Sequence, residues 1–160
     1  STFIEFIKIC KPDVVNSVCK LYSIYDEYNN LNPDLLISML HCLRTVRNAC
    51  AHNERIYGFK RDNGRVNQPF VSYLLKPNTY TKHRAQRLVD LIIYMRYFMQ
   101  DIEYRDFLVQ IKSQFILLQS QLNKNAFEKV RADTGIKNID VLDELSKTSK
   151  RIDYNKFENL

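Results

Sequence analysis

The chain has 160 residues, 45% of them hydrophobic, with 24 Lys and Arg against 18 Asp and Glu, which gives a formal net charge of +6. This length suits one domain with its own core, and the scarcity of glycine (3 residues) and proline (4 residues) argues against a sheet-rich fold, which needs many turn formers. No apolar run reaches the roughly 18 residues of a membrane span. We expect an all-α protein with no membrane partner.

Hydrophobic residues recur at helical spacing along most of the chain. Asn32, Pro33 and Asp34 form a strong helix start, because they supply a side-chain cap, a proline at the first helical position and an acid at the positive end of the helix dipole. The predicted helices cover residues 2–9, 12–28, 33–52, 81–99, 102–122, 126–133 and 141–146.

The segment from Asn53 to Tyr80 loses this periodicity, and within it we expect a short hairpin between residues 65–67 and 70–75. Loops of such length are more often functional than accidental, and this one carries the cations Arg55, Lys60, Arg61 and Arg65. We predict a single helical domain over residues 1–146. Residues 81–99 and 102–122 are expected to form its long antiparallel pair, and residues 147–160 a polar tail.

The basic charge favours an anionic partner such as nucleic acid, although many soluble proteins are mildly basic. The four cysteines form no CxxC pair, and no histidine lies at zinc-finger spacing from them. Free thiols of this kind behave as small hydrophobes, and we expect Cys42 and Cys50 to lie among apolar helical residues. Cysteine usage therefore favours a reducing compartment, the cytoplasm.

The end of the predicted helix 33–52 carries a polar stripe. Residues four apart lie about 40° from one another around a helix, so Arg44, Asn48 and His52 share one side, His41 joins them three residues earlier, and Arg47 lies on the flank. The opposite side is expected to pack the core through Leu35, Met39, Leu43, Val46 and Cys50.

These side chains are sufficient in kind for RNA cleavage by the 2′-hydroxyl. A histidine exchanges protons near neutral pH, an arginine fork fits phosphate oxygens, and no metal or other cofactor is required. The spacing by itself favours a structural role over a catalytic one, since Arg and His near a helix C-terminus complement the helix dipole. Exposure separates the two: catalytic groups converge on an open cleft, whereas structural ones are buried against backbone carbonyls.

The string from Arg47 to His52 has the form RNxxxH and resembles the signature of HEPN-domain proteins, which are helical RNases and RNA binders. The fuller string LRTVRNACAHNERIY, from Leu43 to Tyr57, resembles the stretch LRxxRNxCAHxxRLW of the bacterial abortive-infection family typified by AbiD and AbiF. It departs from that pattern at Ile56, which replaces Leu, and at Tyr57, which replaces Trp.

This resemblance implies a metal-independent endoribonuclease of phage defence, with a HEPN-like helical bundle. It assigns His52 as general acid or base, Arg47 as the group that holds the scissile phosphate, and Asn48 as the residue that orients His52. The implied RNA-binding residues are Arg44 and Arg55 for neighbouring phosphates, Tyr57 for stacking on a base, and His41 within the same stripe.

The resemblance also implies a homodimer, because HEPN nucleases place two motifs face to face and one histidine can hardly be both base and acid. Members of the family are roughly twice this length, so we expect a C-terminal portion or a shortened relative. Whether an RNA or protein antitoxin restrains the protein stays open. The alternatives are a non-catalytic HEPN-like module that binds RNA or a protein partner, and a purely structural helical scaffold.

Overall fold

The computed structural model describes residues 2–26, 28–61 and 86–147, which form seven α-helices and one short 3-10 helix. No β-strand occurs in these ranges, where the extended pairing is limited to two isolated bridges. The all-α fold is therefore confirmed. In chain order the helices are α1 (Thr2–Ile9), α2 (Pro12–Leu21), α3 (Pro33–Ala51), η1 (Ile56–Gly58), α5 (Leu88–Phe98), α6 (Asp101–Gln121), α7 (Lys124–Thr134) and α8 (Asp140–Lys147).

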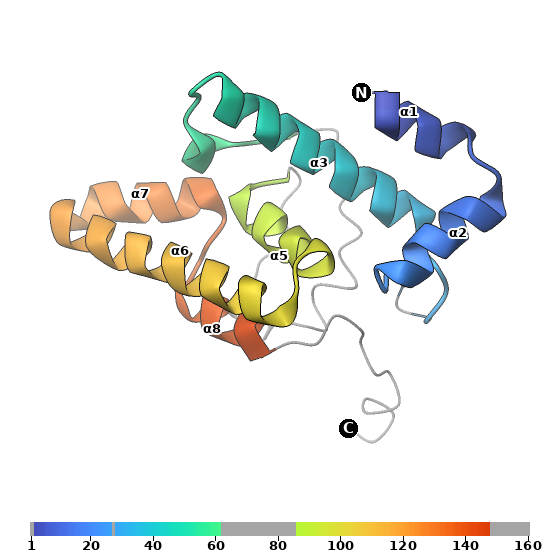
Figure 1. Cartoon of the computed structure of the whole chain (residues 1–160). Helices are drawn as coiled ribbons and strands as arrows, with labels where there is room; N and C mark the ends of the chain where they lie inside the picture. Colours follow the sequence, from blue (N-terminus) through green and yellow to red (C-terminus); the bar gives the residue numbers. More distant parts are fainter. Residues whose placement is uncertain (1, 27, 62–85, 148–160) are drawn as a thin grey trace.

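Helix α5 lies at the centre of the molecule (Figure 1). It is apolar around most of its circumference, as expected for a helix buried on all sides. Leu91, Tyr94 and Tyr97 belong to a first core with α1, α2, α3 and η1, whereas Val89 and Ile92 belong to a second core with α6, α7 and α8. One short helix thus joins two groups of helices that lie far apart in sequence.

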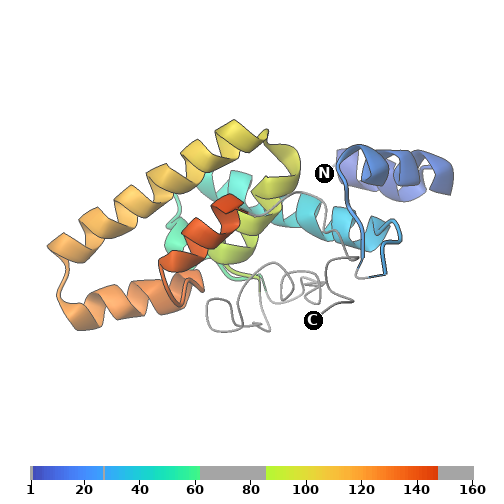
Figure 2. The ribbon, with the colours of Figure 1, turned by 90° about the horizontal axis from the view of Figure 1, so that it is seen from below.

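The two groups occupy opposite ends of the molecule. In both views α6 and α7 run antiparallel at one end, while α1 and α2 lie at the other, beyond the N-terminal half of α3 (Figures 1 and 2). The chain reverses direction between α5 and α6, as predicted, and only Met99 and Gln100 separate these helices. None of the helices in the described part of the chain is long and apolar enough to cross a bilayer.

Helix α3 follows its sequence signals closely. The Asn32 side chain accepts a hydrogen bond from the Leu35 N–H (3.0 Å), and Pro33 occupies the first helical position, as predicted. Helices α6, α7 and α8 also lie within about two residues of their predicted ranges. Gly135, with φ of 78°, ends α7 in the left-handed conformation that glycine adopts without strain.

The predicted helix 12–28 is too long, because α2 ends at Leu21. Ser23 takes a left-handed conformation (φ 56°), after which the Ile24 N–H donates to the Cys19 carbonyl (2.8 Å) and Tyr25 pairs with Leu31 in an antiparallel bridge. The apolar spacing that extended the prediction to residue 28 therefore comes from a turn whose side chains also face the core.

The predicted helix 81–99 also begins later than expected, at Leu88. Gln86 is in extended conformation and exchanges two backbone hydrogen bonds with Arg61 (3.0 and 3.1 Å), while the Arg87 N–H donates to the Asp90 carboxylate (2.8 Å) and so caps the helix. The predicted hairpin and nearly all of the polar tail lie outside the described residues.

Candidate functional site

The polar stripe is carried by the last turns of α3. His52 is the C-cap residue: its backbone N–H donates to the Asn48 carbonyl (3.0 Å), and Asn53 then turns the chain out of the helix with φ of 54°. The 3-10 helix η1 follows after three more residues. The end of α3 and the turn that leads into η1 therefore both lie within a few residues of the motif.

The side chains of the motif are open to solvent. Arg47, Asn48 and His52 are exposed, whereas Arg44 and His41, nearer the middle of α3, are half-buried. Among the described residues, the side chains of the first three make no hydrogen bond or ion pair. Their exposure argues against a role in which they are buried against backbone carbonyls.

The core side of α3 agrees with the prediction only as far as Val46. Leu35, Met39 and Val46 are buried as expected and Leu43 is half-buried, but Cys50 is exposed. The prediction for Cys50 is wrong because the last turn of α3 is only lightly packed: Cys50 and Ala51 are exposed, and Ala49 is half-buried.

No side-chain hydrogen bond joins Asn48 to His52, although the helix places them one turn apart. The contact between these residues runs through the backbone alone. The expected orienting role of Asn48 therefore has no support in this structure, and its side-chain amide has no hydrogen-bond partner within the ranges that the structure describes.

His41 lies in different surroundings from His52. Burial lowers the pKa of the His41 imidazole, and the nearby cations Arg61, Arg44 and Lys8 lower it further, while Glu5 opposes them. The neutral imidazole is favoured there. His41 is therefore a hydrogen-bonding group within a cationic part of the stripe.

Arg61 has a structural role that the sequence did not reveal. We grouped it with the cations of the loop, but its guanidinium donates to the Gln86 side-chain oxygen (2.9 Å), and the Gln86 amide donates to Ser38 Oγ (3.1 Å) and Tyr94 Oη (3.0 Å). Gln86 is completely buried. This network links Arg61 and Gln86 to α3 and α5, and none of its members forms a recognisable motif in the sequence.

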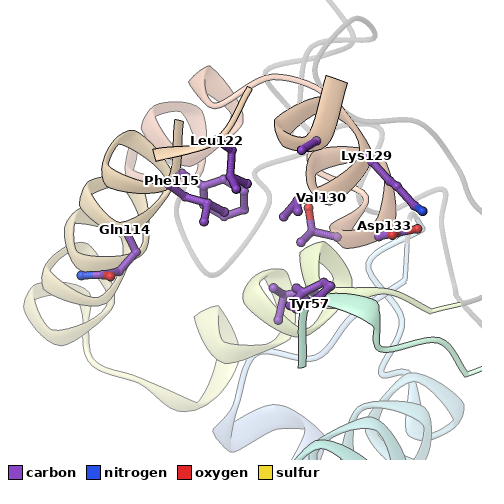
Figure 3. A pocket seen from close by; sticks show the side chains of 11 residues that line it. Tyr57, Gln114, Phe115, Leu122, Lys129, Val130 and Asp133 are labelled. Carbon is purple, nitrogen blue, oxygen red and sulfur yellow. The ribbon is translucent and has the colours of Figure 1, made fainter. Parts of the chain in front are cut away.

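Arg55 and Tyr57 follow the motif in the sequence, and Tyr57 lines a cavity. The Arg55 guanidinium donates to the Tyr57 hydroxyl (3.3 Å), and the Tyr57 ring lines a cavity of about 720 Å³ between η1, α6 and α7. Its interior is apolar, with Phe115, Leu122 and Val130 facing Tyr57 (Figure 3). Sequence analysis did not find this cavity, because its walls come from segments that are distant in the sequence, with Tyr57 on one side and residues 114–134 on the other.

Neither this cavity nor a smaller one, between Arg87 and the end of α7, is lined by Arg47, Asn48 or His52. The exposed side chains of the motif therefore lie outside both of these cavities. Within the described part of the chain, no group of three or more His, Cys, Asp or Glu residues is placed to hold a metal ion.

Comparison with known proteins gives a match over one part of the chain. Residues 1–58 match the family model described as Abi-like protein, and this segment contains α1, α2, α3, η1 and every residue of the predicted site. The match supports an abortive-infection family. No curated protein and no solved structure matches the chain.

Proposed function

We propose that the protein is a metal-independent endoribonuclease of a bacterial abortive-infection system, acting in the cytoplasm during phage defence. The observation that carries this proposal is the exposure of Arg47, Asn48 and His52 together at the end of α3, without partners among the described residues. The Abi-like match over residues 1–58 supports the phage-defence role and includes the whole motif.

The proposed chemistry is transesterification at the scissile phosphate. One imidazole removes the proton of the 2′-hydroxyl, the oxygen attacks phosphorus, and a second group protonates the departing 5′-oxygen, which leaves a 2′,3′-cyclic phosphate. Arg47 offsets the charge that builds on the phosphate oxygens. Arg44 and Arg55 bind neighbouring phosphates, and the Asn48 amide adds a hydrogen bond to the strand.

A homodimer supplies the second catalytic group. Each chain contributes one His52, and a single imidazole cannot serve as base and acid in the same step unless it carries the proton from one oxygen to the other. Two copies of the last turn of α3 that face each other bring two imidazoles to one phosphate. The open surface around the motif leaves room for the second chain.

A non-catalytic RNA- or protein-binding module of the HEPN type is the second candidate function. It is favoured by the placement of Arg47 and His52 outside both cavities described above. A flat cationic surface binds phosphates without enclosing them, as nucleic-acid-binding proteins do when they recognise the backbone alone.

Cleavage of end-labelled RNA in EDTA tests the first function against the second. The parent protein is expected to cut RNA and leave 2′,3′-cyclic termini, while His52→Ala and Arg47→Ala do not. Arg105→Ala is the matched control for Arg47→Ala, because Arg105 is an equally exposed arginine on α6. Absence of cleavage by the parent, at a concentration where light scattering shows a dimer, would favour the binding module.

A further inference from the structure

The cavity between η1, α6 and α7 has the features of a binding site for one planar ring. Its volume of about 720 Å³ falls within the range of roughly 300–1,000 Å³ typical of ligand pockets. We propose that it takes an unpaired base of the RNA strand whose phosphate is bound at the motif. This inference rests on the proposed function, since it requires RNA at the end of α3.

The interior of the cavity suits stacking better than hydrogen bonding. Tyr57 and Phe115 present aromatic rings from opposite walls, and Val130 and Leu122 complete an apolar lining (Figure 3). The charged side chains of Lys129 and Asp133 lie at the edge of the cavity, on α7. Unstacked bases of single-stranded RNA bind aromatic side chains in this way, with little dependence on sequence.

The cavity is within reach of a strand held at the motif. Tyr57 follows His52 by five residues, so their Cα atoms lie no more than about 18 Å apart. Arg55 lies between them in sequence, and its guanidinium donates to the Tyr57 hydroxyl, so that a cation contacts a residue of the cavity lining. A strand of a few nucleotides spans this distance.

The charge around the cavity favours a polyanion over an apolar protein segment. Arg55, Lys60 and Lys129 are all exposed there. The one acidic group of the lining, Asp133, is partly neutralised by Lys60, whose Nζ lies 3.9 Å from its carboxylate. Phosphates on either side of a stacked base would therefore meet cations, whereas a nonpolar helix would gain no binding energy from these charges.

The test uses single-stranded RNA that carries one 2-aminopurine, whose fluorescence falls when it stacks on an aromatic ring. Binding is measured in a His52→Ala background, so that cleavage does not change the RNA. Tyr57→Phe keeps the ring and is expected to retain affinity and quenching, whereas Tyr57→Ala is expected to bind about tenfold more weakly, the scale of one stacked base.

Two further variants, one inside the cavity and one outside it, test whether the effect on binding comes from the cavity. Val130→Glu places a charge inside the cavity and is expected to weaken binding as Tyr57→Ala does. Tyr28→Ala removes a tyrosine that is 77% exposed outside the cavity, and is expected to leave binding unchanged. Thermal unfolding checks that each variant is folded.

The outcomes separate this inference from the proposed function. RNA cleavage by the parent together with equal binding by Tyr57→Ala, Val130→Glu and Tyr28→Ala would overturn the base pocket and leave the nuclease intact. Tyr57-dependent quenching in a protein that does not cleave would support the pocket and remove the nuclease. RNA binding that none of these variants alters would also leave the cavity open to an apolar protein segment, contrary to the proposal.

Discussion

Replacement of Gln86 by leucine tests how much the buried hydrogen-bond network around Gln86 contributes to the free energy of unfolding. The Gln86 side chain accepts one hydrogen bond, from Arg61, and donates two, to Ser38 and Tyr94. At about 1 kcal/mol for each bond, Gln86→Leu is expected to lower the free energy of unfolding by about 3 kcal/mol. In a chain of this size that corresponds to a fall in Tm of about 6–12 °C.

This loss is measured by urea unfolding monitored by circular dichroism. Gln110→Leu is the matched control, because Gln110 is exposed on α6 and its replacement is expected to change the free energy of unfolding by no more than about 0.5 kcal/mol. Tyr94→Phe removes one partner and is expected to cost about 1 kcal/mol. The double variant should cost about as much as Gln86→Leu alone, since the two share a bond. Strict additivity, or a Gln86→Leu loss below 0.5 kcal/mol, would refute the network as described.

Three further predictions concern the dimer, pH and thiols. If each active site needs two copies of His52, mixing the parent protein with a ninefold excess of His52→Ala chains should lower the activity per parent chain about tenfold, because only about one parent chain in ten then pairs with another parent chain when subunits exchange freely. Active sites that need one chain alone would leave this activity unchanged. Folding lowers the pKa of His41, so the His41 side chain takes up a proton more readily in the unfolded chain than in the folded one as pH falls below about 6.5, and the free energy of unfolding should decrease there. His41→Asn should reduce this dependence of stability on pH, which urea midpoints measured between about pH 7.5 and 5.5 report. An unaltered pH dependence would exclude His41 as its source. Burial raises the pKa of the Cys42 thiol to about 12, whereas Cys50 is exposed. Peptide mapping after treatment with a thiol reagent at about pH 8 should therefore find Cys50 modified and Cys42 unmodified until urea unfolds the chain. Modification of Cys42 in the folded protein would contradict its burial.

The parts of the fold that could be predicted from the sequence are those with local causes. The start of α3 depends on the Asn32 side chain and on Pro33, which act on the residues that directly follow them. The end of α7 depends on Gly135 alone. In each case the sequence contains the whole interaction within about four residues, and periodicity places the helix between such signals.

The errors arose where distant residues decide the local structure. Gln86 continues a helical pattern in the sequence, but its backbone pairs with Arg61, twenty-five positions earlier, and its side chain fills a polar gap between α3 and α5. The cavity is a similar case, because Tyr57, Phe115 and Val130 meet only after three elements have packed. Local propensity carries no information about such contacts.

The misplaced Cys50 and the open motif have one cause. The buried positions of α3 end at Val46, and in its last turn Asn48, Cys50 and Ala51 are exposed while Ala49 is half-buried. A helix turn with so little burial depends mainly on its backbone hydrogen bonds and caps, and Arg47 and His52 have no hydrogen-bond or ion-pair partner among the residues that the structure describes. In the proposed dimer, two copies of this turn that face each other would bring two His52 imidazoles to one phosphate, which is why the exposure of the turn supports that proposal.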